Sequence, residues 1–253
     1  MKKTVLLITS MLTFFAFGIE AQEASVLVDS ANKYYSQGRY DKAINTYQKV
    51  IEQGYESSDL YYNLGNAYYK ARELAPAILH YERARLRDPG NEDIQYNLQL
   101  ARSQITDNVE NIPDFFITRW VTQLINLYPS DIWAVISMIT FILFLALFSV
   151  YLYSQRLGLK KSGFWIGLLA LAIAVSSFIF ASQQKNEVIN SEQAIVFAPK
   201  VTAKSSPAES GTDLFVIHEG TKVFIEDEMG EWYEISLSDG SQGWLRKKSV
   251  EPI

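Results

Sequence analysis

Few side chains in this sequence have the chemistry of a catalytic or metal-binding site. The chain has no cysteine and only two histidines, His80 and His218. This excludes disulfide frameworks, thiolate zinc sites, iron–sulfur clusters, cysteine nucleophiles and a multi-histidine metal site. The acidic residues at 226–231 fall in an expected hairpin, where such clusters are usually solvated surface. Since no Ser–His–Asp or paired-carboxylate spacing points to a pocket, we expect no catalytic residues, no metal and no cofactor.

The overall composition favours a folded protein that binds other molecules. The 253 residues are 48% hydrophobic and 20% charged, which fits a folded chain rather than a disordered one. The formal net charge is -5, which argues against a general nucleic-acid binder, because such a protein needs a basic face to neutralise phosphates. The remaining classes are a binding or scaffolding protein, or an enzyme that uses only carboxylates and hydroxyls.

An internal repeat occupies residues 25–106. The clearest copy places a bulky residue, Leu-Gly, Tyr, Ala, an aromatic residue, Ala and Pro at Tyr61, Leu64, Gly65, Tyr68, Ala77, Tyr81, Ala84 and Pro89. An earlier copy fits the same pattern about 34 residues upstream, and a third begins at Asp93 and soon loses the pattern. These spacings resemble the tetratricopeptide (TPR) repeat, in which pairs of helices stack into a curved array. We interpret the third copy as a capping helix.

The resemblance to TPR proteins implies a concave face that takes an extended peptide or a helix of a partner. By their position in the repeat, the residues at this groove are Asn32, Tyr62, Asn66 and Lys70. The two equivalent asparagines resemble part of the carboxylate clamp with which some TPR proteins hold a C-terminal carboxylate. The basic residues of that clamp are missing, so we expect no complete clamp. The asparagines then hydrogen-bond the backbone of a partner or simply face solvent.

Three apolar blocks indicate a membrane protein. Residues 1–21 have the positive start, apolar core and small final residue of a secretory signal peptide, with an uncleaved anchor as the alternative. Residues 132–155 and 162–184 carry no charge, and each is long enough to cross a bilayer as a helix. The loop between them, 156–161, holds three cations and no acid, which predicts a cytoplasmic location. Both soluble parts then lie outside the cytoplasm in a multi-pass membrane protein.

The segment at 107–130 forms a linker in which we expect an amphipathic helix. Phe116, Trp120, Leu124 and Leu127 share one side of the helical pattern. Aromatic side chains suit the depth of a membrane interface, so we favour a helix that lies on the membrane before the first span. The alternative is a helix that packs against the repeats.

Residues 190–253 change to the period-two pattern of short strands separated by turns that contain glycine. We expect such strands to close into a small barrel, which hides their edges. The strand order and the closing motif Asp-Gly-x-x-Gly-Trp-Leu at 239–245 resemble a bacterial SH3-like domain. Such domains bind peptides or cell-wall material, or serve as adaptors. The resemblance makes Trp232, Tyr233 and Trp244 candidate surface residues, although we expect at least two of them to pack inside. His218 is expected to be structural.

Taken together, the order of these segments resembles the BatE family of the Bacteroides aerotolerance operon over nearly the full chain. The amino-acid sequence at 201–207 and 214–223 is similar to the C-terminal part of that family. The resemblance implies a multi-domain membrane protein with an α-helical TPR array, two transmembrane helices and a C-terminal all-β SH3-like barrel. It also implies partners that are membrane proteins with von Willebrand factor A domains, a MoxR-type ATPase system, and a role in aerotolerance or stress resistance.

Two functions follow from this organisation. The first is a non-enzymatic inner-membrane scaffold or adaptor that binds envelope proteins through its TPR repeats. The second is a cell-wall sensor or anchor in which the SH3-like domain binds peptidoglycan and the repeats are secondary. No acidic or basic residue lies inside either apolar span, so neither proton relay nor ion transport is expected.

Overall fold

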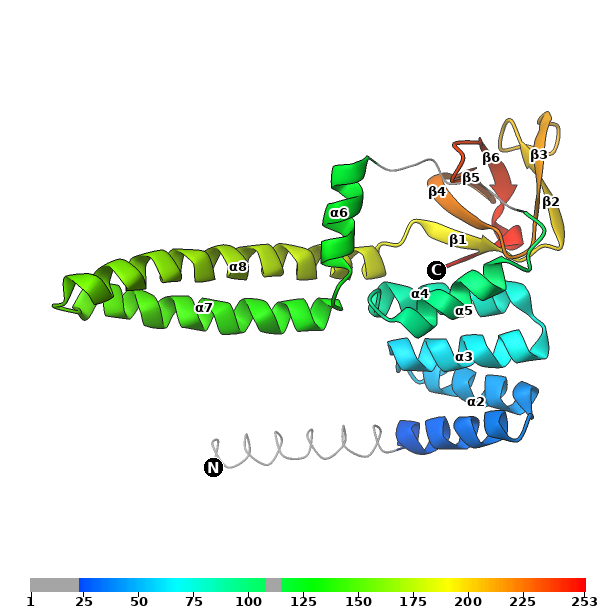
Figure 1. Ribbon diagram of the computed structural model, residues 1–253. Coiled ribbons are helices and arrows are strands. Elements are labelled where there is room, and N and C mark those ends of the chain that lie inside the picture. The colour runs from blue at the N-terminus through cyan, green and yellow to red at the C-terminus, as the bar shows by residue number, and fades with distance from the viewer. Residues whose placement is uncertain (1–22, 108–114) are drawn as a thin grey trace, which may run out of the picture.

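The computed structural model describes residues 23–107 and 115–253 (Figure 1). The expected signal peptide at 1–21 lies outside the described residues, and so does the part of the linker at 108–114. A stack of short helices and a small sheet lie together at one end of the molecule. A long helical hairpin projects from them (Figure 1).

The stack of helices is built from pairs that follow one another along the chain. Residues 23–36 form the first helix, and the others are α2 (Tyr40–Glu52), α3 (Ser58–Ala71), α4 (Leu74–Arg87) and α5 (Glu92–Arg102). Ser57 caps α3 by accepting the N–H of Leu60, and the side chain of Asn91 caps α5 in the same way. Gly38, in the turn before α2, adopts a φ of 73°, a conformation that favours glycine.

Small residues allow the two helices of the second pair to approach closely. A Cβ atom on Gly65 of α3 would lie 2.7 Å from Cδ1 of Tyr81 on α4, so a larger residue would push the tyrosine ring away. Ala77 and Leu64 are fully buried beside this contact. Two such helix pairs are followed by the single helix α5, which occupies the position of the first helix of a third repeat.

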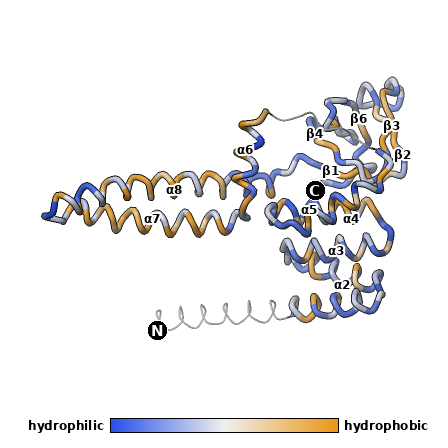
Figure 2. Tube along the Cα trace, viewed as in Figure 1, coloured by the Kyte–Doolittle hydropathy of each residue, from blue (hydrophilic) through white to orange (hydrophobic). Residues whose placement is uncertain are grey.

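The hairpin consists of two long apolar helices, α7 (Ser130–Tyr153) and α8 (Leu157–Ile189), joined by a turn at 154–156. By length and composition both helices are suited to cross a membrane, and most of their length has the hydrophobic colour in Figure 2. Small residues of α8, including Gly163, Gly167 and Ala174, face α7, and Ser137 donates a hydrogen bond of 2.9 Å to the carbonyl of Ala174. The helix α8 begins at Leu157, so the two lysines of the expected loop 156–161 are helical, because the stretch contains no proline to end a helix.

A short helix, α6 (Phe116–Ile125), lies across the end of the hairpin (Figure 1). Its carboxyl end is tied to the long helices. The carbonyl of Ile125 accepts hydrogen bonds from the indole of Trp133 at 2.8 Å and from the side-chain amide of Gln184 at 2.7 Å. The same amide donates to the carbonyl of Tyr128 at 3.0 Å, so the turn between α6 and α7 is fixed on α8.

The C-terminal part is a single antiparallel sheet of seven strands in the order β3-β2-β6-β5-β4-β1-β7. The strands are β1 (Gln193–Val196), β2 (Lys200–Lys204), β3 (Asp213–His218), β4 (Lys222–Met229), β5 (Trp232–Ser236), β6 (Gln242–Arg246) and β7 (Val250–Pro252). Gly220, Gly230 and Gly240 take positive φ angles in the turns, where only glycine is free of strain. The inner residues, such as Val223, Ile235 and Leu245, form a hydrophobic core that is separate from the core of the helical array.

The sheet does not close into the barrel that the strand pattern suggested. Within residues 191–253, the edge strands β3 and β7 pair with β2 and β1 and not with each other. The physical reason lies at the β7 end, where the helical array covers the sheet instead. Arg83 of α4 donates a 2.7 Å hydrogen bond to the carbonyl of Pro252, while Ile195 and Ile253 pack into the core of the array. Covering the β7 edge with a helix protects that edge.

Candidate partner-binding groove

A pocket of about 290 Å³ opens between the helices of the array. It is lined by residues from the first helix, α3, α4 and α5, namely Tyr35, Tyr62, Asn66, Tyr69, Lys70, Tyr81, Asn97 and Leu100. Tyr35 and Tyr69 are equivalent positions one repeat apart, so the stacking of the repeats brings the two side chains to the same pocket. We refer to these eight residues as the groove.

The polar side chains of the groove form a connected network. Asn66 Oδ1 accepts hydrogen bonds from the Tyr81 hydroxyl at 2.8 Å and from Asn97 Nδ2 at 3.0 Å. Asn97 Nδ2 also donates to the Tyr62 hydroxyl at 2.8 Å. The Tyr69 hydroxyl accepts from the side-chain amide of Gln104, which follows α5. These bonds link α3, α4 and the region of α5, and they hold the groove side chains in fixed orientations.

The electrostatics of the groove favour a partner that offers hydrogen-bond acceptors. Burial, together with the neighbouring Tyr62, raises the pKa of Tyr81, and burial also raises the pKa of Tyr35, so both hydroxyls stay protonated. Lys70 is exposed and is the one charged residue among the eight that line the groove. With several hydroxyl and amide donors, one cation and no carboxylate, the groove suits the carbonyls or acidic side chains of a peptide.

Three of the four residues expected at the concave face lie in this groove. Tyr62, Asn66 and Lys70 line it, whereas Asn32 does not. The Asn32 side chain instead accepts a 2.6 Å hydrogen bond from the Tyr47 hydroxyl, which repeats the Tyr81–Asn66 bond one repeat earlier.

Sequence reasoning missed five groove residues, which are Tyr35, Tyr69, Tyr81, Asn97 and Leu100. The repeat spacing that joins Tyr35 to Tyr69 was a usable signal for those two. The pattern alone does not tell which tyrosines direct a hydroxyl to the groove rather than only filling the core.

The aromatic residues proposed as a surface on the sheet are mostly covered. Trp232 and Trp244 are only 8% and 9% exposed, and Tyr233 is half-buried. The guanidinium of Arg246 lies 4.9 Å from the Trp232 ring centre, and the ammonium of Lys247 lies 5.0 Å from that of Tyr233. The ring faces therefore already have cationic neighbours from the sheet itself.

Other polar sites offer less chemistry. A pocket of about 410 Å³ between the end of α8 and β4 is lined mainly by amide and carboxylate side chains, including Glu187, Glu192 and Glu226. In the described ranges 23–107 and 115–253, no group of three or more His, Cys, Asp or Glu residues is arranged to hold a metal ion. His218 pairs with Asp107, with 2.8 Å between Nδ1 and Oδ1.

Comparisons with known proteins agree with the geometry of the array. Residues 31–71 match the family model described as TPR repeat, and residues 58–91 match the model described as Tetratricopeptide repeat. The chain is similar to RNA polymerase II-associated protein 3 of Rattus norvegicus, with 29% identity over 136 residues covering 47% of this chain and 21% of that protein. The Homo sapiens protein of the same name is 36% identical over 59 residues, covering 23% of this chain and 9% of that protein. The chain thus spans about a fifth or less of the length of these relatives. Residues 31–91 contain TPR repeats.

Proposed function

We propose that the protein is a non-enzymatic, membrane-anchored adaptor that binds a protein partner through the groove of its TPR repeats. The observation that carries this proposal is the groove itself, an open pocket with an ordered network of tyrosine and asparagine side chains. TPR repeats are in general protein-binding modules, because their stacked helices present an extended concave surface.

The two long apolar helices support a location in a bacterial inner membrane, with the array and the sheet on the periplasmic side. The resemblance to the BatE family suggests partners with von Willebrand factor A domains, a MoxR-type ATPase system and a role in aerotolerance. We propose the same partners and the same role for this protein. The domain limits inferred from the sequence, 25–106 for the array and 190–253 for an SH3-like unit, belong to the same proposal.

The helix α6 supports the membrane assignment. Phe116 and Trp120 are 71% and 72% exposed, although both are large and hydrophobic. Because α6 lies across the end of the apolar hairpin, the helix is at the level where a bilayer interface would begin (Figures 1 and 2). We infer that α6 lies on the membrane surface rather than against the repeats.

The alternative function, binding of peptidoglycan through the sheet, has weaker support. Trp232 and Trp244, two of the three aromatic residues suggested for a wall-binding surface, are largely buried. The adaptor function is therefore preferred.

A pair of charge reversals tests the adaptor function. Lys70 and Lys49 are both exposed lysines in the last turn of a TPR helix, on α3 and α2, but only Lys70 lines the groove. Full-length Lys70→Glu and Lys49→Glu proteins would be expressed in native membranes, crosslinked briefly and purified in detergent, and the captured proteins identified by mass spectrometry. We expect Lys70→Glu to lose captured proteins that the wild type and Lys49→Glu retain. Equal capture by all three proteins would contradict binding in the groove.

A further inference from the structure

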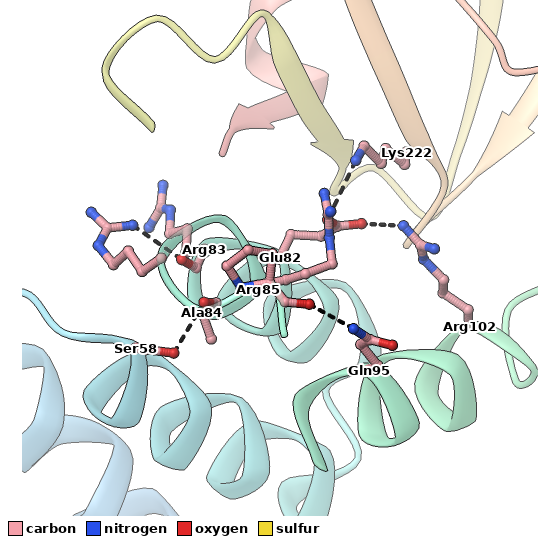
Figure 3. Close-up of polar contacts among 10 residues, drawn as sticks. Ser58, Glu82, Arg83, Ala84, Arg85, Gln95, Arg102 and Lys222 are labelled. Atoms are coloured by element: carbon pink, nitrogen blue, oxygen red, sulfur yellow. Dashed lines mark hydrogen bonds and ion pairs between the residues drawn. The ribbon is translucent and has the colours of Figure 1, made fainter. Parts of the chain in front are cut away.

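The array and the sheet are joined by a buried group of charges. Glu82 of α4 is fully buried, and its carboxylate contacts Arg85 at 3.0 Å, Lys222 of β4 at 3.3 Å and Arg102 of α5 (Figure 3). Burial alone would raise the pKa of Glu82, but these three cations lower it to about 2, so the carboxylate is charged. One carboxylate thus ties α4, the end of α5 and the sheet together.

A second contact lies beside the first, at the turn between β3 and β4. Asp107 accepts hydrogen bonds from the backbone N–H of His218 at 2.6 Å and from the Thr221 hydroxyl at 2.8 Å. Between these two residues, Gly220 sits against the array. A Cβ atom at this position would lie 2.6 Å from Cγ2 of Ile105 and 3.2 Å from Cδ1 of Ile78. The turn therefore fits closely against the array.

The place where the sheet docks is the end of an incomplete repeat. In a TPR array each first helix packs against a second helix of its own pair, and terminal repeats need a cap. Here α5 ends at Arg102, and residues 103–107 continue without helix. The sheet contacts α4 through Lys222 and Glu82, and it contacts the chain just after α5 through His218 and Asp107. In a longer array, this is the side on which the next helix would pack.

The position of α5 matters to the groove. Asn97 and Leu100 of α5 line it, and Asn97 hydrogen-bonds both Tyr62 and Asn66. Gln104, three residues before Asp107, donates to the hydroxyl of Tyr69. The segment that the sheet holds at its end is therefore the same segment that completes one wall of the groove.

We propose that the C-terminal sheet is the cap of the TPR array, and that its docking holds α5 in the position that completes the groove. Asp107, Gly220 and Lys222 are then positioning residues for partner binding, although none of them lines the groove. The sheet takes the role of the helix that the third repeat lacks. The part that concerns partner binding rests on the proposed function of the groove, whereas the capping role does not.

The proposal is tested first by an engineered disulfide in the full-length protein. The Cβ of Ile105 lies 3.6 Å from the position of a Cβ on Gly220, within the range of disulfide bonds. Because the chain has no cysteine, the double variant Ile105→Cys, Gly220→Cys has no competing thiol. In nanodiscs we expect the disulfide to form, while the control pair Ile105→Cys, Gly230→Cys stays reduced. The change Ile105→Cys removes the Cγ2 atom that a Cβ at position 220 would meet at 2.6 Å, so this pair does not disturb docking as a substitution of Gly220 alone would. Failure of the first pair to oxidise would therefore overturn the docked geometry.

Hydrogen exchange then tests whether docking supports the array. The variant Gly220→Ala places a methyl group against Ile105 at a positive φ, whereas Gly230→Ala, also at a positive φ, meets no atom within 4 Å. We expect Gly220→Ala to raise the exchange rate of the α5 amides by about tenfold or more, and Gly230→Ala to leave it unchanged. The oxidised disulfide variant should show slower exchange in α5 than its reduced form. If α5 exchange is the same in all of these proteins, the sheet is not a cap.

A photo-crosslinker in place of Tyr69 separates the two proposals. If the adaptor function is correct, the crosslinker at position 69 gives protein adducts when the sheet carries no substitution. Combination with Gly220→Ala should then lower their yield. Adducts whose yield is unaffected by Gly220→Ala would overturn the coupling and leave the adaptor function. An absence of adducts in every protein, with the exchange result as expected, would overturn the adaptor function and leave the cap.

Discussion

At the scale of residues, one hydrogen bond recurs in both complete repeats. The Tyr47 hydroxyl donates to Asn32 and the Tyr81 hydroxyl donates to Asn66, and each pair joins the two helices of a repeat. Both asparagines therefore position helices, and Asn66 also lines the groove. Their equivalence was predictable from the repeat spacing. Their bonds to tyrosine were not, because the pattern fixes which residues are equivalent but not where a hydroxyl points.

Removal of one of these hydroxyls should weaken the array. We expect Tyr81→Phe to lower the free energy of unfolding by about 1 kcal/mol, because a hydrogen bond between partly buried groups is lost while the ring remains. The control is Tyr96→Phe, since Tyr96 is 67% exposed and its hydroxyl has no bond among the described residues. Urea unfolding of the full-length protein, followed by circular dichroism, would measure both. An equal effect of the two variants would show that the bond contributes nothing.

At the scale of elements, α4 carries an unusual buried histidine. His80 lies between the rings of Tyr61 and Tyr68 of α3, at 5.8 Å and 5.4 Å between ring centres. Its Nδ1 atom has no hydrogen-bond partner among the described residues. Burial, and to a lesser extent Arg83, lowers the pKa of His80 to about 3, so the folded protein holds a neutral imidazole.

This histidine makes the stability of the array depend on pH. The unfolded chain binds a proton on His80 below its ordinary pKa of 6.5, whereas the folded chain does so only near 3. Stability therefore falls as the pH is lowered from 6.5, by up to about 1.4 kcal/mol for each pH unit. We expect His80→Phe, which keeps the stacked ring, to flatten the profile between pH 6.5 and 5. Parallel profiles of the two proteins in chemical denaturation would contradict this account.

The helix α6 makes a second prediction at this scale. If it lies on a membrane surface, Trp120 faces lipid and Thr122, about half a helical turn away, faces water. The full-length variants Trp120→Cys and Thr122→Cys, each with a spin label in nanodiscs, should differ in accessibility. We expect oxygen to relax the label at 120 more strongly and a water-soluble nickel complex to relax the label at 122. Equal access of the nickel complex to both labels would show that α6 is not at the interface.

At the scale of the whole molecule, the order of the parts was readable from the sequence but their assembly was not. The TPR spacing, the two apolar stretches and the glycine turns of the sheet each leave a local signal, because a repeat, a membrane helix and a hairpin are built from neighbouring residues. The contact of Glu82 with Lys222 joins residues 140 positions apart. No periodicity records such a pair, and the same is true of Gly220 against Ile105.

This assembly changes how experiments on the protein should be designed. Deletion of the sheet would remove Ile195 from the core of the array and expose the residues that it covers. It would also remove Lys222 from Glu82. Loss of partner binding after such a deletion would therefore not show that the partner binds the sheet. Point variants that leave both parts in place give a clearer answer.

Removal of the charge at the centre of the assembly should have a large effect. Glu82→Gln leaves three cations near one another with no buried anion between them. We expect a loss of about 3–5 kcal/mol in the free energy of unfolding, the range for breaking a buried ion pair from one side. The control Glu92→Gln changes an exposed acid in the first turn of α5 and should cost far less. Chemical denaturation at pH 7 would compare the two, and similar losses would contradict the central place given to Glu82.

The central claim is that a protein partner occupies the groove of the TPR repeats, and site-specific photo-crosslinking tests it most directly. A benzophenone amino acid would replace Tyr69, which lines the groove, or Tyr96, which is exposed on α5 outside it, in the full-length protein in native membranes. Both changes replace a tyrosine with a larger aromatic residue of similar shape. We expect irradiation to give a discrete protein adduct from position 69 and none of that mass from position 96. The same adduct from position 96, with none from position 69, would contradict the claim.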